Sequence, residues 1–491
     1  MNPLLLTFVL FAGPVPASLP VQEPPAGEEA EEAAPAAEEA AEAPVEEAAE
    51  SAEESPWLAV VGGDVHTVTR GVIPDGTVLC RDGRIFAVGR DVRIPEGARV
   101  LRVDGMQVYP GLVAADSRGF VRGRGRDAVD SFDPFSLQVD LALTGGLTTV
   151  FGSGMVVKLT RGSLDGYAVR VNPFVTLNVS PTSPGGRRSA RERFGKARDF
   201  LRELSDWQLR KDLGEDVGEA PEPEGVDEDA LALLRGEKTA RFNANDLKDL
   251  IAICEFLEEY PMKSVVYGGR EAWIVAGRLG RAGVRMVIHA RDKRWADPDL
   301  NRPSGWSIEN ARILWEHGVE FAIVPAQASV STMGIMGRDL MTLPIEADFA
   351  IRGGLPQEAA LEAITLDAAK VLGVDHRLGS IEPGKDADLV ICDGDLFHYR
   401  TFVQWTVVNG RVVYDKQERP YFAHVRPRPE IAPEEALQAL EEALSGDGDE
   451  AAVSTEDESG PGEGAAGGAD GEADDEAEHG AEAERTAGSG S

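Results

Sequence analysis

Two strand-rich blocks flank a longer region in which strands and helices alternate. Residues 57–108 alternate apolar and polar side chains between frequent turns, and residues 377–416 have the same character. The Asp82-Gly83 step between two such runs is a strong β-hairpin signal. We therefore expect a small composite β-sandwich that is built from both sides of the intervening region, with bounds at 56–108 and 376–425.

The intervening region has the pattern of an α/β fold. Apolar runs such as 147–151, 284–288 and 321–324 are separated by segments with helical periodicity. This alternation favours a parallel (β/α)8 barrel of the TIM type, which we assign to residues 109–375. The highly charged stretch at about 187–237 is interpreted as an insertion into that barrel.

Nearly all of the net charge of −36 lies in two end segments. Residues 22–55 hold 13 Glu and no Lys or Arg, and residues 430–491 hold 20 Asp or Glu against one Arg. Segments so poor in apolar side chains cannot offset the entropy of ordering, so both are predicted to be disordered. The folded part keeps almost no net charge and has no basic patch, which argues against nucleic-acid binding.

The first residues have the composition of an export signal. A short apolar run at 3–12 precedes small side chains at 15–18, and the run is too short to span a bilayer. We predict a signal peptide at 1–21 and therefore an exported protein, periplasmic or extracellular, with no transmembrane segment in the mature chain. Three widely spaced cysteines suggest neither a disulfide framework nor a zinc site.

Two long strings carry a family resemblance. The YPGLV segment at 109–113 and the strings LEAITLDAAKVLG at 361–373 and GSIEPGKDADLVI at 379–391 resemble the amidohydrolase superfamily, and within it the imidazolonepropionase-like branch. The resemblance implies the barrel with its composite sandwich. It also implies hydrolysis of non-peptide C–N bonds by one or two divalent metal ions such as zinc, held by histidines and an aspartate at the strand ends.

This chain departs from the family at those ligand positions. In relatives the first strand continues as PGLVDAHSH. A later segment reads LVHAHRADDI, the strand after it reads LVIEHGTEAW, and a further strand ends in GTDA. In the matching register this chain has Asp116, Arg118, Asn243, Asn245, Gly268 and Ala326. Arginine has only hydrogen-bond donors, an amide oxygen is a weak ligand, and glycine and alanine side chains offer none. We therefore predict no metal and no other cofactor, and we assign these six residues together with Lys158 to a binding pocket.

Other arrangements of the same residues stay open. His289 at a strand end is a candidate general base with Asp292 orienting it, or a structural histidine. Asp116, Asn243 and Asn245 offer oxygens to a hard cation, which Arg118 would oppose. A hydrogen-bond network of Arg118 with Asp116, or with one of the asparagines, is the preferred alternative. Arg122, Arg124 and Arg126 give the mouth loops positive charge, which favours an anionic ligand or merely solvates the loop.

These observations predict a degenerate amidohydrolase that binds a small molecule or serves as a partner subunit, as a homo-oligomer or beside an active relative. The alternative is an active amidohydrolase or imidazolonepropionase-like hydrolase with a rearranged site around His289, Asp292 and Asp116. A third hypothesis is an envelope structural protein that binds nothing.

Overall fold

The computed structural model describes residues 55–122, 130–292, 294–332 and 338–418. The predicted segments at 1–21 and 430–491, and all of 22–55 except Ser55, lie outside the described residues, as do Arg124 and Arg126. Within the described ranges no helix is both long and apolar enough to cross a membrane.

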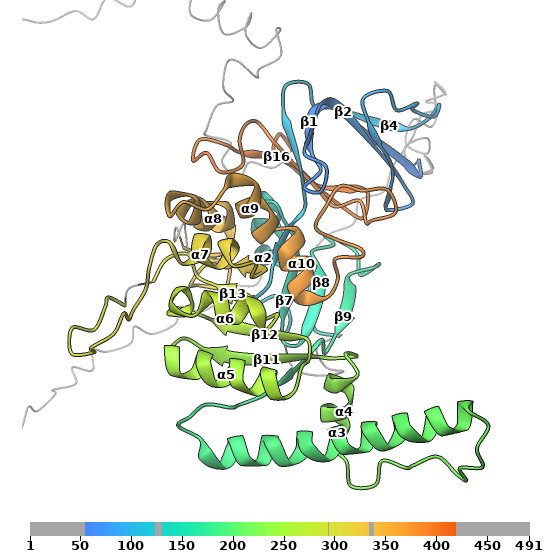
Figure 1. Cartoon of the computed structure of the whole chain (residues 1–491). Coiled ribbons are helices and arrows are strands. Elements are labelled where there is room, and N and C mark those ends of the chain that lie inside the picture. Colours follow the sequence, from blue (N-terminus) through green and yellow to red (C-terminus); the bar gives the residue numbers. More distant parts are fainter. Residues whose placement is uncertain (1–54, 123–129, 293, 333–337, 419–491) are drawn as a thin grey trace, which may run out of the picture. The chain divides into compact units, whose positions relative to one another are not determined.

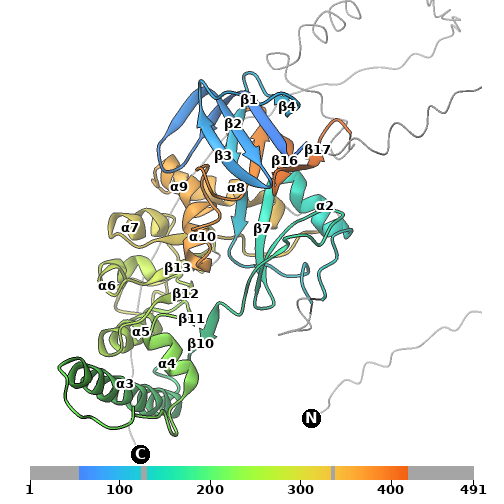
Figure 2. The ribbon, with the colours of Figure 1, turned by 90° about the vertical axis from the view of Figure 1, so that its right-hand side faces the viewer.

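One eight-stranded sheet is assembled from both sides of the barrel sequence (Figure 2). Its strands are β1 (Trp57–His66), β2 (Val72–Arg81), β3 (Arg84–Gly89), β4 (Arg99–Arg102), β5 (Gln107–Pro110), β15 (Leu389–Cys392), β16 (Val403–Val408) and β17 (Arg411–Asp415). The order is β17-β16-β15-β5-β1-β2-β3, with β4 beside β1. Strand β15 runs antiparallel to β5, with Leu389 opposite Pro110, so this pair joins the two strand blocks of the predicted β-sandwich into one hydrogen-bonded sheet.

The Asp82-Gly83 hairpin forms as predicted. Arg81 pairs with Arg84 across the turn between β2 and β3. Asp82 and Gly83 have φ values of 49° and 78°, the left-handed conformations that a two-residue turn of this kind requires.

The barrel strands form two hydrogen-bonded arcs. The first contains β6 (Leu112–Ala114), β7 (Leu147–Gly152), β8 (Met155–Lys158) and β9 (Ala168–Val171). The second contains β10 (Phe174–Thr176), β11 (Thr239–Ala244), β12 (Ser264–Gly268), β13 (Arg285–Ile288) and β14 (Phe321–Ile323). All neighbouring strands in the second arc are parallel, as are β6 and β7. Strand β8 runs antiparallel to both of its neighbours, β7 and β9.

Both arcs enclose the same apolar core. Val113, Phe151, Val265, Val287 and Ala322, which come from five strands of the two arcs, belong to one buried cluster. Helix α10 (Leu366–Leu372) packs into this cluster and contacts β6, β13 and β14. The shared inner core confirms the predicted α/β barrel class, because two unrelated sheets would bury separate faces.

The outer strand faces are covered by helices (Figure 1). These are α5 (Leu247–Glu259), α6 (Ala276–Arg281), α7 (Asn310–Glu316), α8 (Leu343–Arg352) and α9 (Gln357–Ala363), and α2 (Leu137–Thr144) packs beside β7. Two short 3-10 turns, η1 (Ala272–Ile274) and η2 (Leu340–Thr342), lead into α6 and α8.

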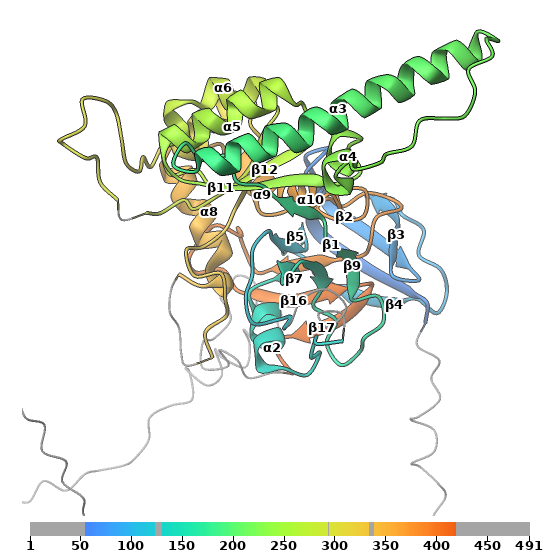
Figure 3. The same cartoon turned by 90° about the horizontal axis from the view of Figure 1, so that it is seen from below.

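The charged stretch between β10 and β11 folds mainly into α3 (Pro184–Asp212) and α4 (Glu228–Leu234). Helix α3 buries Ala190, Phe194 and Phe200, and the Phe194 and Phe256 rings lie edge to face with centroids 5.2 Å apart. Beyond Phe200 the helix has no buried residue and extends away from the strands (Figure 3).

Candidate functional site

The predicted pocket residues gather at the carboxyl ends of the barrel strands. Asp116 and Arg118 follow β6, Asn243 and Asn245 lie at the end of β11, Gly268 ends β12, His289 follows β13, and Ala326 follows β14. The backbone N–H of Arg118 donates to the Ala328 carbonyl at 2.6 Å, so the loops after β6 and β14 adjoin. We call this end of the barrel the mouth; it is where the chemistry of such barrels is placed.

Arg241 is an inward-facing residue that sequence reasoning missed. Its neighbours Ala240 and Phe242 pack outward against the helices, so strand alternation turns Arg241 toward the barrel interior with Asn243. The guanidinium carbon lies 3.7 Å from the Tyr267 ring centroid and 5.9 Å from that of Phe151. The signal was present in the sequence, because a charged residue stands among alternating apolar positions of a barrel strand.

The guanidinium of Arg241 is incompletely satisfied. Its buried Nε has no hydrogen-bond partner, and within the described part of the chain the Arg241 side chain forms no hydrogen bond or ion pair. Guanidinium carries five N–H donors, and a buried donor left unpaired costs about 1–3 kcal/mol. The stacking on Tyr267 offsets part of that cost, since cation–π contacts contribute about 0.5–2 kcal/mol.

Asp116 is half-buried beside this guanidinium. Burial raises the pKa of Asp116, and the positive charges of Arg241 and then Arg118 lower it only in part. The Arg118 side chain is exposed, and the described residues include no Asp116–Arg118 hydrogen bond. The predicted network between these two side chains is therefore wrong, because Arg241 supplies the charge that acts most strongly on Asp116.

Tyr267 anchors the base of the mouth. Its hydroxyl donates to the Ala115 carbonyl at 2.9 Å, directly before Asp116. Burial raises the Tyr267 pKa far above its usual value, so the hydroxyl stays protonated and keeps this bond.

His289 is held by the backbone. Its Nδ1 lies 3.0 Å from the Val324 carbonyl oxygen, and because a carbonyl only accepts, Nδ1 carries the proton. The neutral ring then keeps the lone pair on Nε2. The prediction that Asp292 orients this histidine is wrong: Asp292 accepts from the Arg294 N–H at 3.1 Å and lies 3.8 Å from Arg270.

Gly268 and Asn245 fit against each other. Gly268 has φ of 116°, and a Cβ there would lie 2.6 Å from the Asn245 Oδ1 and 2.7 Å from the Ala244 carbonyl oxygen. No side chain is accommodated at 268 without moving β11 and its amide.

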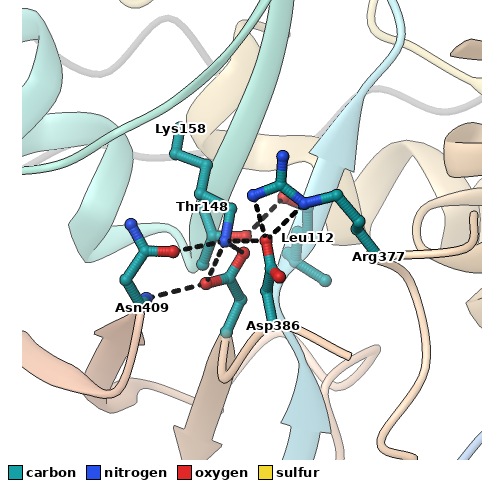
Figure 4. A network of polar contacts seen from close by, with 7 residues as sticks. Leu112, Thr148, Lys158, Arg377, Asp386 and Asn409 are labelled. Carbon is teal, nitrogen blue, oxygen red and sulfur yellow. Dashed lines mark hydrogen bonds and ion pairs between the residues drawn. The ribbon is translucent and has the colours of Figure 1, made fainter. Parts of the chain in front are cut away.

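Lys158 lies away from the mouth, which corrects its assignment to the pocket. Its side chain is fully buried, with Nζ 2.7 Å from Asp386, 3.0 Å from Asp388 and 2.5 Å from the Asn409 Oδ1 (Figure 4). The Asp388 carbonyl accepts from the Gly111 N–H directly before β6 begins. Lys158 therefore ties the amino-terminal end of the barrel strands to the loop before β15, because the buried ammonium needs anionic partners that the mouth does not offer.

A cavity of about 320 Å³ opens beside the mouth. Its lining includes Thr176, Asn178, Ser180, Phe242, Asn243 and Asp249. Ser180 donates to Asp249 at 2.6 Å, which fixes one wall. Asn243 is exposed and is the one residue of the predicted pocket that lines this cavity, whereas Phe242 places the cavity on the helix-facing side of β11.

In the ranges that the structure describes, no group of three or more His, Cys, Asp or Glu side chains could hold a metal ion.

A family model for the amidohydrolase family matches residues 254–419, from α5 through the last strand of the composite sheet. The chain carries an amidohydrolase family domain. This domain includes β12, β13 and β14, and with them Gly268, His289 and Ala326 at the mouth.

Curated proteins with sequences similar to this chain include amidohydrolases and imidazolonepropionases. Amidohydrolase tasK of Hapsidospora irregularis is 24% identical over 65% of this chain and 38% of that protein. An imidazolonepropionase of Porphyromonas gingivalis is 37% identical over 12% of this chain and 16% of that protein. The chain thus spans less than two thirds of the length of these curated relatives.

The fold comparison agrees. The crystal structure of an amidohydrolase from Thermotoga maritima MSB8 superposes with a TM-score of 0.53 at 24% identity, covering 73% of this chain and all of the other. At that identity the likeness concerns the fold alone.

Proposed function

We propose that the amidohydrolase-type barrel of this chain binds a small molecule at its mouth and has lost metal-dependent hydrolysis. The observation that carries this proposal is the Arg241 guanidinium, which stacks on Tyr267 and points into the barrel beside Asp116. A fixed positive charge at this place opposes a second cation and favours an anion.

The donor set also fails to fit a zinc-like ion. Such ions take thiolate, imidazole or carboxylate ligands, usually three or four. Of the residues in the family register only Asp116 offers a carboxylate, while the other positions hold amides, an arginine, glycine and alanine. No hydrolytic step through a metal is therefore assigned to this chain.

The close contact between Gly268 and Asn245 further supports the proposal, because it leaves no room for the family's histidine at position 268. Restoring a histidine at 268 would place Cβ within 2.7 Å of two oxygens, so this position cannot revert alone. A recent loss at one position would leave its neighbours unadapted, whereas here the neighbouring amide fills the space.

Metal analysis of the untagged, full-length protein tests the proposal. The protein would be produced in medium supplemented with zinc, manganese and iron and then measured by plasma mass spectrometry. We expect far less than one ion per chain. One or two transition-metal ions per chain, together with hydrolysis of a cyclic amide that a chelator abolishes, would overturn it.

The alternative function keeps hydrolysis at a rearranged site. It draws on the neutral His289 ring, whose Nε2 lone pair is available as a general base. This version predicts that His289→Ala abolishes a measurable amide hydrolysis while the thermal midpoint stays the same; absence of any hydrolysis by the wild-type protein would exclude it.

Export and assembly belong to the same proposal. We propose that residues 1–21 direct export and that the protein acts as a subunit beside copies of itself or an active relative. Fractionation of cells that produce the full-length chain tests the first part, and light scattering of the purified protein, alone and mixed with such a relative, tests the second.

A further inference from the structure

We infer that the mouth binds the carboxylate of a small organic acid that also carries a hydrogen-bond donor, with Arg241 as the main anchor. This inference rests on the proposed binding function and names the chemical class of the ligand.

The first argument is the unused hydrogen-bonding capacity of Arg241. Tyr267 covers one face of the guanidinium, which leaves the donors in its plane directed at their surroundings. The buried Nε lacks a partner, and Arg241 makes no ion pair with the described residues. A carboxylate accepts two parallel N–H bonds from such a planar fork and satisfies the donors that the fold leaves unpaired.

The second argument is the charge balance around Arg241. Arg270 lies 2.7 Å from Asp246 and 3.8 Å from Asp292, and Arg291 is ion-paired with the buried Glu346. These neighbouring cations are therefore already compensated. Arg241 and the exposed Arg118 together face one half-buried carboxyl, Asp116, so one negative charge is missing. A monoanion balances the mouth.

Asp116 does not exclude an anionic ligand. Arg241 and Arg118 carry two positive charges against the one negative charge of the carboxylate, so the mouth keeps a net positive charge with Asp116 ionised.

The third argument concerns the donor on the ligand. With its Nδ1–H donating to the Val324 carbonyl, the neutral form of His289 presents an acceptor at Nε2, and this side chain is close enough to Asp116 for the two to interact electrostatically. The exposed amide of Asn243 both donates and accepts. A hydroxyl or amino group next to the carboxylate finds these acceptors, whereas a bare fatty acid does not.

Calorimetric titration of the full-length protein in low-chloride buffer tests this inference. The probes are glycolate, its neutral amide glycolamide, acetate and inorganic phosphate. We expect glycolate to bind most tightly and glycolamide to show no heat of binding. Arg241→Met should weaken glycolate binding at least about tenfold, the loss of one charge-assisted contact. The control Arg188→Met removes an exposed arginine of α3 and should bind as the wild type does.

Several outcomes would overturn the inference. These are equal binding of glycolate and glycolamide, tighter binding of phosphate than of glycolate, no binding of any of the four probes, or unchanged glycolate binding by Arg241→Met. If Arg241→Met does not fold, Arg241→Lys keeps the charge without the fork and should still weaken glycolate binding. If the protein is free of metal and binds none of the probes, the inferred organic-acid ligand is wrong but the proposed loss of metal-dependent hydrolysis stands. If the protein contains stoichiometric metal, the proposed function itself is wrong.

Discussion

The Nζ of Lys158 lies 2.7 Å from an Asp386 carboxylate oxygen, and neither side chain is more than 4% exposed. Arg377, which is partly exposed, reaches the same oxygen at 2.7 Å, and Asp388 lies 3.0 Å from Lys158, so two cations face two buried anions. The pair joins β8 to the loop that leads into the composite sheet. It holds the two layers in register at the end of the barrel opposite the mouth.

Replacing Lys158 should therefore destabilise the fold strongly. Lys158→Met leaves Asp388 buried without its cation, and breaking a buried pair from one side costs about 3–5 kcal/mol. Urea unfolding followed by circular dichroism measures the change. The matched control is Lys385→Met, whose ion pair with Glu382 at 3.5 Å is partly exposed and should contribute less than about 1 kcal/mol. Equal losses in the two variants would contradict this account.

Acid should weaken the same cluster. Although burial raises the pKa of Asp386, the charges of Lys158 and Arg377 outweigh it and hold that pKa below the ordinary 3.8. A carboxyl with a lowered folded-state pKa stabilises the protein above its unfolded-state pKa, and that contribution disappears as pH falls through the folded value. Asp386→Asn should thus be less stable than the wild type at pH 7, and the difference should shrink below pH 3.8. A difference that stays constant from pH 7 to pH 3 would speak against it.

Asp116 should respond in the opposite direction. Burial raises the pKa of this carboxyl, so its contribution to stability is fully present below about pH 3.8 and is lost as pH rises through the folded value. Asp116→Asn removes the charge, and we expect its thermal midpoint to exceed that of the wild type at pH 7 but not at pH 3. An Asp116→Asn protein that melts lower than the wild type at pH 7 would show that the ionised carboxylate is stabilising.

Gly268→His should not restore the family residue without damage. The φ of 116° and the two oxygens that would lie within 2.7 Å of a Cβ at this position predict a loss of about 2 kcal/mol or more in unfolding free energy. Gly268→Ala separates the backbone strain and the Cβ contact from the bulk of the ring. If the double variant Gly268→His with Asn245→Ala recovers much of the loss, the Asn245 amide is the obstacle; no recovery leaves the Ala244 carbonyl and the backbone as its cause.

Features of the fold that depend on neighbouring residues could be predicted from the sequence. The Asp82-Gly83 turn depends only on neighbouring residues, and it forms as expected. The contacts of Lys158 could not be read from the sequence, because Asp386, Asp388 and Asn409 lie more than 220 positions along the chain. Arg241 stands two residues before Asn243 on the same face of β11. Its inward orientation depends on which face of β11 meets the helices, and that is a property of the tertiary structure.

The pairing of β5 with β15 has a consequence for biosynthesis. A ribosome completes β5 and must then make the entire barrel before β15 emerges to cover the hydrogen-bonding edge of β5. During that interval the nascent chain presents an open strand edge, which invites pairing with other chains. Production of this protein should accordingly depend on how the growing chain is shielded, and a chain interrupted within the barrel would expose the edge that the finished molecule hides.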